Sequence, residues 1–353
     1  MSDIEYRQLG GSGIGVPALG VGTQAWGDKR WGFGESYTSG DLFQAYQASI
    51  DAGLNYFDTS DSYGKGQSEE MLGEFYRNDG RPIIISTKFT PAKPYDPNTH
   101  FSPKAVMPTL ERSLQRLELQ TIDLYQIHYP PAHRKLDGFL DVMAESVKSG
   151  KAKAIGVSNF NVQLLRYSHE YLTRHHDIPL ASNQISYSLL DRHLETNGML
   201  AACRELNISV IAILPMAEGV LTGKYRGGEL KPSGTLSVML RAAQMMQPQT
   251  PLRERFFTKP LGLQPEKLEP LFVAMEEVAQ AHEASLAQVA LNWLLASDPL
   301  ILPIPGAKNM KQAVSNAAAL KWRMSQGEFN RLAQIEDAIS RSRKPLNGLN
   351  STG

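Results

Sequence analysis

The sequence predicts an α/β fold in which eight parallel strands close into a (β/α)8 barrel. Short apolar runs alternate with longer segments of helical periodicity from residue 18 onward. Each run is too short for a helix, and several are rich in Ile and Val, as strands buried on both faces are. The eight runs cover residues 18–23, 54–59, 83–88, 122–128, 152–158, 181–186, 208–214 and 301–306. One closed barrel accounts for this number of strands and for the chain length.

A doubly wound open sheet is the alternative architecture. It would place a G-x-G-x-x-G turn at the start of the first helix. The run GGSGIG at 10–15 loosely resembles that turn, but it precedes the first strand of the alternation. We interpret it as the turn of an N-terminal β-hairpin at the barrel floor, and we favour the barrel.

The segments between the strands have helix signals. In residues 102–119, Ser102 is a candidate N-cap, Pro103 suits the first helical position, and Pro108 is expected to kink the helix. An apolar stripe in this segment consists of Val106, Leu110, Leu114 and Leu117. Residues 137–151 form another expected helix, which ends at Gly150.

The chain is expected to form one domain over residues 1–343, with an extra helix at its C-terminal end. No Pro/Gly/Ser-rich linker divides it, and the polar tail 344–353 is expected to be disordered or foreign to the domain. The connection around residues 227–262 is unusually long. Loops of this length are usually functional lids or disordered segments, and this one would lie over the C-terminal face of the barrel.

Composition excludes several classes of function. Lys+Arg and Asp+Glu are both 36 and no polybasic run occurs, so no nucleic-acid partner is expected. Cys203 is the only cysteine, which rules out an intrachain disulfide and a thiolate metal cluster. The sequence has neither a run of about 18 apolar residues nor a secretory signal, so we expect no membrane partner and a cytoplasmic location. The oligomeric state stays open.

Four ionisable residues follow neighbouring strands of the predicted barrel. Asp58 ends the second strand, Tyr63 lies in the loop after it, Lys88 ends the third strand and His128 the fourth. Taken singly, each has an ordinary explanation such as a turn cap, a loop aromatic or a solvated strand end. Together they lie at the barrel end where active sites occur, which indicates a catalytic group.

Proton transfer by a tyrosine is the chemistry that this set suits. A free phenol has a pKa near 10 and donates protons poorly at neutral pH. We expect the Lys88 ammonium to lower the pKa of Tyr63, Asp58 to orient Lys88, and His128 to hydrogen-bond the substrate oxygen or the phenol. The result would be a general acid that faces a carbonyl oxygen.

With these residues identified, the chain resembles the aldo-keto reductases over roughly residues 5–340. The resemblance rests on the stretches GLNYFDTSDSYGKGQSEEMLG, IISTKF, IDLYQIH, GKAKAIGVSNF, GVLTGKY and PIPGAKNMKQAVSNAAAL. It implies a (β/α)8 barrel that reduces an aldehyde or ketone with NADPH. Asp58, Tyr63, Lys88 and His128 would be its catalytic tetrad.

The resemblance also implies a binding site for NADP(H). The residues expected beside the nicotinamide and its ribose are Gly22, Thr23, Asp58, Ser158, Asn159 and Gln184. Those expected along the pyrophosphate are Ile213, Leu214, Pro215, Met216, Ala217 and Lys224. Those expected at the adenosine end are Gly306, Lys308, Gln312, Ser315 and Asn316. A glycine before a helix start suits a phosphate, because backbone N–H groups and the helix dipole point at it.

The chain departs from the family pattern at two places. Ile213 and Leu214 replace the aromatic residue and serine that many members carry, and Ser315 replaces a common glutamate. The stacking contribution of an aromatic ring on the nicotinamide is therefore absent. We expect a weaker cofactor affinity than is typical.

Two other functions compete with a reductase. Some barrels that resemble this family bind the dinucleotide and serve as regulatory subunits of larger assemblies, including potassium channels. The complete tetrad favours the enzyme, while Ile213 and Leu214 keep the regulatory alternative open. A barrel isomerase without a dinucleotide would leave Lys308, Gln312 and Asn316 unexplained.

The partner is expected to be a small carbonyl compound whose identity the sequence does not reveal. Candidate walls of its pocket are the aromatic residues Trp26, Trp31, Phe89 and Tyr129. Packing at the barrel rim explains any one of them about equally well. An aromatic lining would suit a planar or apolar compound.

Overall fold

Eight parallel strands form the sheet of this computed structural model, which describes residues 4–91, 102–131, 135–226 and 265–342. They are β3 (Val21–Gly22), β4 (Tyr56–Asp58), β5 (Ile84–Phe89), β6 (Ile122–Ile127), β7 (Ala152–Ser158), β8 (Ser182–Ser186), β9 (Ser209–Ile213) and β10 (Ile301–Pro303). Each lies within or across one of the apolar runs, and their order in the sheet follows the chain. The eight predicted strands are confirmed.

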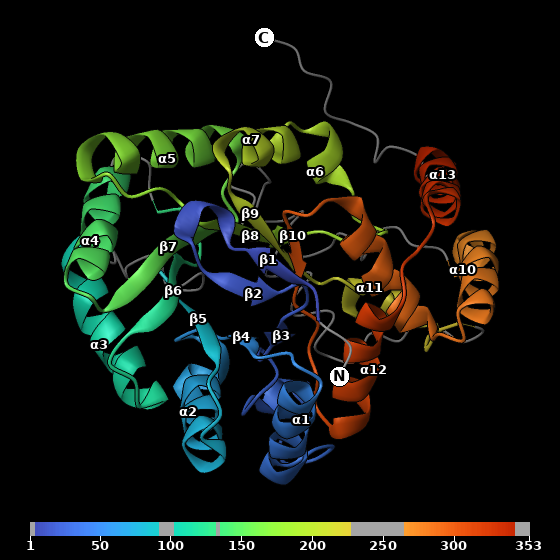
Figure 1. Cartoon of the computed structure of the whole chain (residues 1–353), viewed down its shortest axis with the longest axis horizontal. Coiled ribbons are helices and arrows are strands. Elements are labelled where there is room, and N and C mark those ends of the chain that lie inside the picture. Colours follow the sequence, from blue (N-terminus) through green and yellow to red (C-terminus); the bar gives the residue numbers. More distant parts are fainter. Residues whose placement is uncertain (1–3, 92–101, 132–134, 227–264, 343–353) are drawn as a thin grey trace, which may run out of the picture.

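The sheet closes on itself between its first and last strands. The Gly20 amide donates to Pro303 O (2.9 Å), the Gly22 amide donates to Pro305 O (3.0 Å), and Gly22 pairs with Gly306 in a parallel bridge. A Cβ at Gly22 would lie 2.9 Å from Ile304 O, so the close approach of the two segments requires glycine. The predicted barrel is confirmed, and Figure 1 looks along it.

An antiparallel hairpin covers one end of the barrel (Figure 1). It consists of β1 (Tyr6–Gln8) and β2 (Gly15–Pro17). Leu9 and Val16 pack into the barrel interior against apolar residues of the strands, among them Leu124 and Ile211. Gly10 has a φ of +52°, and a Cβ there would lie 2.3 Å from Ala181 O. The predicted hairpin at the floor is thus confirmed.

The buried Arg7 ties this hairpin to the last part of the barrel. Its guanidinium donates to Leu295 O (2.8 Å), Asp298 O (3.0 Å) and Ile301 O (2.7 Å). Three main-chain carbonyls at the end of a helix and the start of β10 are thereby satisfied by one side chain.

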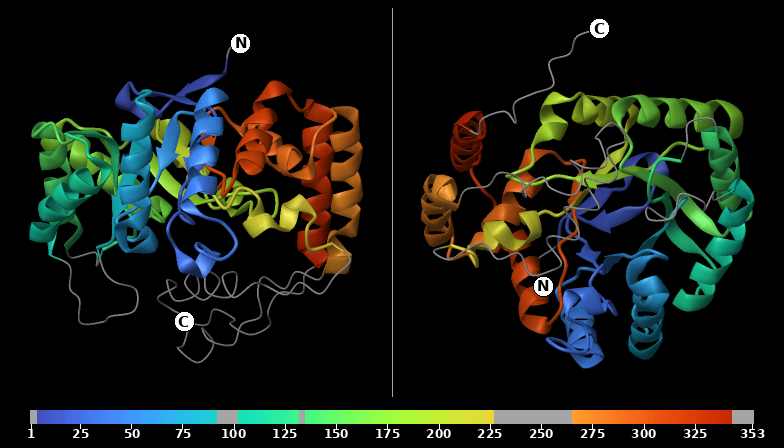
Figure 2. Two further views of the ribbon diagram at one scale, coloured as in Figure 1. Left: turned by 90° about the horizontal axis from the view of Figure 1, so that it is seen from below. Right: turned by 180° about the vertical axis from the view of Figure 1, so that it is seen from behind.

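Helices surround the sheet in all views (Figures 1 and 2). They are α1 (Ser39–Asp51), α2 (Gln67–Asp79), α3 (Val106–Leu117), α4 (Leu136–Lys148), α5 (Val162–His176), α6 (His193–Thr196), α7 (Met199–Leu206), α10 (Glu269–Ala281), α11 (Leu286–Ser297), α12 (Met310–Ala318) and α13 (Gln326–Ser342). The last of these, α13, packs beside α10 and is the extra C-terminal helix that the sequence predicts. Short 3-10 helices at the loops include η2 (Lys29–Trp31), η3 (Tyr63–Gly66) and η6 (Ala217–Thr222).

The predicted kink at Pro108 is replaced by a helix start. Residues Pro103–Ala105 form a 3-10 turn that Ser102 caps by accepting from the Lys104 amide, and α3 begins only at Val106. Pro108 is therefore the third residue of α3, where a backbone N–H has no intrahelical partner. The apolar stripe that begins at Val106 faces the core, as predicted.

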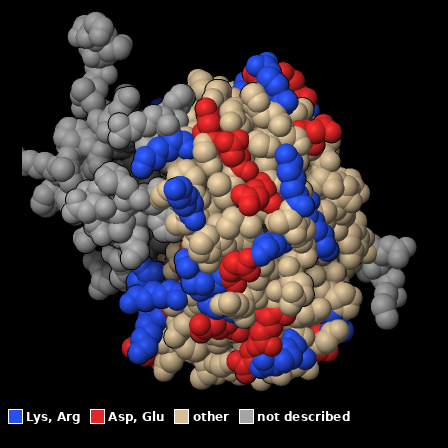
Figure 3. Space-filling view, turned by 90° about the vertical axis from the view of Figure 1, so that its left-hand side faces the viewer, with Lys and Arg blue, Asp and Glu red and all other residues tan. Residues whose placement is uncertain are grey.

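The outer face formed by helices such as α3 and α4 carries Lys, Arg, Asp and Glu interspersed with one another (Figure 3). An ion pair between Glu111 of α3 and Lys151, just after α4, contributes to this balance. None of the helices in the described ranges is both long and apolar enough to cross a bilayer. The single domain over 1–343 and the cytoplasmic location stay predictions, and the segment 227–262 and the tail 344–353 lie outside the described residues.

Candidate active site

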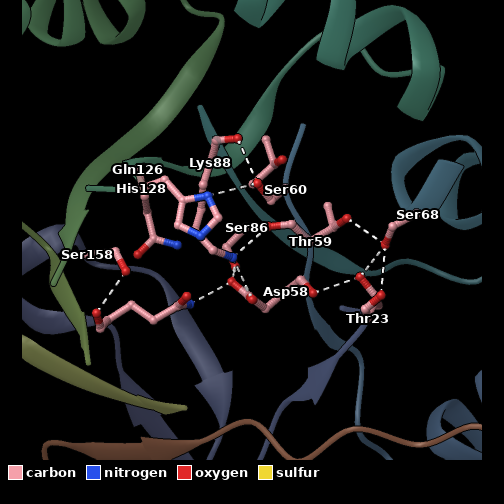
Figure 4. A network of polar contacts seen from close by, with 12 residues as sticks. Thr23, Asp58, Thr59, Ser60, Ser68, Ser86, Lys88, Gln126, His128 and Ser158 are labelled. Carbon is pink, nitrogen blue, oxygen red and sulfur yellow. Dashed lines mark hydrogen bonds and ion pairs between the residues drawn. The ribbon is translucent and has the colours of Figure 1, made fainter. Parts of the chain in front are cut away.

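A buried ion pair joins the carboxyl ends of β4 and β5 (Figure 4). Lys88 Nζ lies 2.7 Å from Asp58 Oδ2 and donates to Thr59 O at 2.6 Å. Asp58 Oδ1 accepts from Ser86 Oγ (2.7 Å) and from Gln184 Nε2 (2.8 Å). The Lys88 and Asp58 side chains are 0% and 2% exposed. Because Asp58 and the Thr59 carbonyl are themselves held in place, the Lys88 ammonium is held in one position.

A turn of left-handed residues directs Tyr63 over this ion pair. Gly64, Lys65 and Gly66 have φ of 56°, 60° and 98°, and they bend the chain between Tyr63 and α2. The Tyr63 ring lies with its centroid 4.9 Å from Lys88 Nζ. Its edge meets the His128 ring at 5.7 Å between centroids and 82° between planes. The glycines of this loop thus serve to aim the phenol.

The phenol of Tyr63 is protonated in this environment. Burial raises its pKa well above the usual value, and Asp58, Tyr129 and Asp61 raise it further. The net shift is opposite to the lowered pKa that the sequence led us to expect, because burial outweighs the other influences on the phenol. The positive charge of Lys88 is compensated by Asp58 at 2.7 Å, and it lies over the ring. The side chain is therefore held as an acid with its proton in place.

His128 is neutral and held from several sides. Burial lowers its pKa well below the usual value, and Lys88 adds to the decrease. Its Nδ1 lies 3.1 Å from Ser60 Oγ and 3.3 Å from Thr90 Oγ1, and its ring stacks on Tyr129 at 4.4 Å between centroids. A neutral imidazole offers one donor and one acceptor nitrogen. The structure thus brings together all four residues of the predicted tetrad.

Two of the four predicted pocket residues belong to the core. Trp26 and Phe89 are both 0% exposed, and Trp26 Nε1 donates to Ala307 O (2.9 Å). Phe89 follows Lys88 on β5, so the two side chains point to opposite faces of the sheet. The prediction is corrected for these two residues. Trp31 and Tyr129 are partly exposed, and Tyr129 lies beside His128.

The residues predicted for the nicotinamide end adjoin the tetrad. Thr23 Oγ1 donates to Asp58 O (2.9 Å), and Ser158 Oγ donates to Gln184 O (2.9 Å). Asn159 has a φ of +62°, which Asn tolerates better than most residues, and its Nδ2 donates to His128 O (3.1 Å). Gly22 of β3 pairs with Gly306 at the barrel seam. Predicted cofactor residues and catalytic residues therefore share one end of the barrel.

The predicted pyrophosphate segment is a tightly curved turn after β9. Leu214, Ala217 and Glu218 have φ of 54°, 47° and 57°, a backbone conformation that is strained for residues other than glycine. Pro215 is buried, while Ile213 and Met216 are partly buried. Such strain concentrates at binding and catalytic loops.

Sequence reasoning missed Glu218 in that turn. Burial raises the pKa of its carboxyl to about 7, and Lys224 opposes the rise. The sequence did offer a signal for Glu218, because an acidic residue is unexpected in a segment predicted to bind phosphates. Two further residues that the sequence analysis missed contact the tetrad: Ser86 contacts Asp58, and Thr90 contacts His128. Ser86 could have been found, because it lies two residues before Lys88 and so shares its face of the strand.

Two lysines interact here, Lys308 of the predicted adenosine end and Lys224 of the predicted pyrophosphate segment. Burial lowers the pKa of Lys308, and Lys224 lowers it further. Lys308 Nζ donates to Trp31 O (3.0 Å) and lies 4.9 Å from the centroid of the Tyr37 ring. Lys224 Nζ lies 4.6 Å from the centroid of the Tyr225 ring. Two neighbouring positive charges suit a phosphate ligand, although Lys224 also acts on the Glu218 carboxyl.

Hydrogen bonds from α12 hold the other residues of the predicted adenosine end in place. The helix begins at Met310 with Asn309 as its N-cap, so Lys308 precedes the helix. Gln312 Oε1 accepts from the Lys308 amide (2.8 Å), and Asn316 Nδ2 donates to Gly306 O (3.2 Å). Ser315 contributes its carbonyl to Gln288 Nε2 (3.1 Å).

Comparison with known proteins identifies the family of this chain. A family model described as the Aldo/keto reductase family matches residues 18–337. The chain is 31% identical to a chloroplastic pyridoxal reductase of Arabidopsis thaliana, covering 94% of this chain and 86% of that protein. It is 29% identical to an NADP(+) aldo-keto reductase of Schizosaccharomyces pombe, covering 91% and 89%.

A solved structure agrees with this result. A thermostable aldo-keto reductase crystallised with the inhibitor epalrestat superposes with a TM-score of 0.69 at 26% identity, covering 94% of this chain and 100% of the other. The family resemblance predicted from the motifs is therefore confirmed, together with NADP(H) as the cofactor of the family and oxidoreductase as the class of enzyme. The chain belongs to the aldo/keto reductase family.

Proposed function

We propose that this protein reduces an aldehyde or ketone to the alcohol, with Tyr63 as the proton donor. The observation that carries the proposal is the buried Asp58–Lys88 pair beneath the Tyr63 ring, with the neutral His128 at its edge. Bound NADPH supplies the hydride. A carbonyl oxygen placed between Tyr63 and His128 would gain negative charge as the hydride arrives, and both side chains offer it hydrogen bonds.

Each member of the tetrad has a separate task in this proposal. Tyr63 keeps its proton at neutral pH until the oxygen becomes basic. Lys88 lies close enough to stabilise the phenolate that forms when the proton leaves. Asp58 holds Lys88 through its own hydrogen bonds to Ser86 and Gln184. The Lys88 ammonium thus lies beside the phenolate that Tyr63 becomes when it gives up its proton.

The donor set at this end of the barrel fits NADP(H). Ser158, Asn159 and Gln184 offer hydroxyl and amide groups beside the tetrad, which suit a carboxamide. Lys224 and Lys308 supply positive charge for phosphates. We assign these residues to the cofactor, and with them Gly22, Thr23, the turn 213–217 and the residues Gly306, Gln312, Ser315 and Asn316.

The substrate class that we favour is a planar or apolar carbonyl compound. Tyr129 stacks on His128 and Trp31 lies on the neighbouring loop, so aromatic surface adjoins the proposed oxygen site. The relative from Arabidopsis thaliana bears the name of a reductase of pyridoxal, an aromatic aldehyde. Aromatic aldehydes are therefore the first compounds to test.

Turnover of NADPH distinguishes a reductase from a dinucleotide-binding regulatory subunit. The experiment follows NADPH absorbance with a panel of aromatic aldehydes including pyridoxal, aliphatic aldehydes and ketones, and it measures NADPH binding separately. We expect oxidation that depends on the added carbonyl compound. Tight binding of NADPH without turnover on any panel member would contradict the proposal and favour the regulatory subunit.

Replacement of Lys308 by alanine is expected to weaken NADPH binding by about tenfold and NADH binding much less. The 2′-phosphate is the group that only NADPH carries, and the Lys308 ammonium is a donor for it. Affinities are measured by titration of each cofactor against the tryptophan fluorescence of the protein. Lys311→Ala is the matched control, because Lys311 lies three residues further along and is exposed. Equal affinities of the wild type for both cofactors would refute the assignment.

A further inference from the structure

Three hydroxyl groups surround one nitrogen of His128. Its Nδ1 lies 3.1 Å from Ser60 Oγ, 3.3 Å from Thr90 Oγ1 and 3.5 Å from Ser62 Oγ. Figure 4 shows Ser60 pointing toward the His128 ring. A hydroxyl both donates and accepts, so these contacts alone leave open which ring nitrogen carries the proton. The tautomer is decided by where the hydroxyl hydrogens point.

Asp61 competes for those hydrogens. Its Oδ1 lies 3.3 Å from Ser60 Oγ and 3.4 Å from Thr90 Oγ1, the same two hydroxyls that lie closest to Nδ1. The Asp61 amide donates to Lys88 O at 3.0 Å, which fixes the backbone of this residue against β5. Ser60 Oγ has two further partners, Ser62 Oγ at 3.0 Å and Lys88 O at 3.3 Å. Thr90 is therefore the hydroxyl whose direction depends most on Asp61.

We infer that Asp61 is a positioning residue that selects, through Ser60 and Thr90, which nitrogen of His128 carries the proton. An ionised Asp61 accepts from both hydroxyls, which then present only lone pairs to His128, so the proton lies on Nδ1. Nε2 is then an acceptor. A protonated Asp61 donates to Thr90, the Thr90 hydrogen turns to Nδ1, and the proton lies on Nε2.

The change of the His128 tautomer is expected within an experimentally accessible pH range. Burial raises the pKa of Asp61 to about 6, Glu69 of α2 raises it further, and Arg116 of α3 opposes the rise. Three other titratable groups adjoin it, since Asp61 influences Lys88 on β5, Tyr63 on η3 and Tyr125 on β6. His128 itself stays neutral throughout, because its own pKa lies well below the usual value.

The selection affects the proposed reaction, and to that extent this inference rests on the proposed function. A carbonyl oxygen accepts hydrogen bonds, so it needs Nε2–H from His128. The wild type should therefore lose kcat/KM for reduction by about two- to tenfold as pH rises through the Asp61 titration, in line with the loss of one hydrogen bond. Asp61→Asn should not show this decrease, because its amide donates to Thr90 at every pH.

The tautomer is measured by NMR of protein carrying 15N-labelled histidine. The chain has 8 histidines, and comparison with His128→Gln assigns the signal of His128. We expect the proton on Nδ1 at about pH 8 and on Nε2 at about pH 5 in the wild type. In Asp61→Asn and in Thr90→Val the pH dependence should disappear.

Thr121→Val is the matched control, because Thr121 lies just before β6, the strand that leads to His128, and donates to a main-chain carbonyl, Gly150 O (2.8 Å). It should leave the His128 tautomer unchanged. The inference is overturned if the wild type carries the proton on Nε2 at both pH values, or if Thr121→Val changes the signal as much as Thr90→Val. NMR gives this answer even if the protein fails to oxidise NADPH, so failure of the proposed function is distinguishable from failure of this inference.

Discussion

Replacement of Tyr63 by phenylalanine is expected to reduce the rate of carbonyl reduction by at least ~100-fold, the lower range for loss of a general acid. The change removes only the hydroxyl. The ring keeps its place 4.9 Å from Lys88 Nζ and its edge contact with His128. Because the phenol faces the substrate, the affinity for NADPH should stay within about twofold of the wild type. Steady-state rates and a cofactor titration on the same preparation check both statements.

A control separates this effect from a general loss of a tyrosine hydroxyl. Tyr167 lies on the outer helix α5 and donates to Asp137 (2.6 Å), so Tyr167→Phe should retain full activity. Near-normal turnover by Tyr63→Phe would remove this residue from the mechanism. A large loss of NADPH affinity in the same variant would assign it to the cofactor instead.

Replacement of Lys88 by methionine is expected to reduce activity as severely as Tyr63→Phe and to destabilise the protein as well. Methionine has the unbranched shape of lysine and is one heavy atom shorter, but it leaves Asp58 buried without its cation. Removing one partner of a buried ion pair costs about 3–5 kcal/mol of the free energy of unfolding. The proton transfer also loses the cation that stabilises the phenolate. Denaturant unfolding and steady-state kinetics measure the two losses separately.

Two double variants test whether these residues act as a unit. Tyr63→Phe combined with Lys88→Met should be no slower than the slower single variant, since both remove the same step. Lys88→Met combined with Asp58→Asn removes the uncompensated charge, so we expect stability to return without activity. Losses that multiply in the first pair, or activity that returns in the second, would contradict a shared role.

The sequence predicts the barrel and the tetrad well because both follow from strand periodicity. The ends of β4, β5 and β6 place Asp58, Lys88 and His128 at one rim, and this follows from the order of the strands alone. The same periodicity explains why Phe89 belongs to the core: it alternates with Lys88 and points the other way. The error at Phe89 came from adjacency in the chain, which is not adjacency in space.

Features set by loops and local charge could not be predicted in this way. The pKa of Tyr63 depends on burial and on Asp61, whose position is fixed by a backbone hydrogen bond to Lys88 O. Thr90 reaches His128 only because the chain turns after β5. The position of Lys308 before α12 depends on Asn309 as the cap, and several residues near 308 could have filled that role. Such details depend on loop geometry, for which a single sequence has no periodic signal.

The hydrogen bonds that Arg7 donates to distant carbonyls also have a consequence for folding during synthesis. Its partners lie 288 to 294 residues further along, so the floor hairpin cannot lock until α11 and β10 have left the ribosome. Closing a loop of that length costs on the order of 5 kcal/mol in chain entropy. Until then β3 and β9 remain open strand edges, the kind of surface that invites pairing with another chain. From the synthesis of β9 until that of β10, the nascent protein therefore carries two open strand edges, and chaperone contact is most valuable to it in that interval.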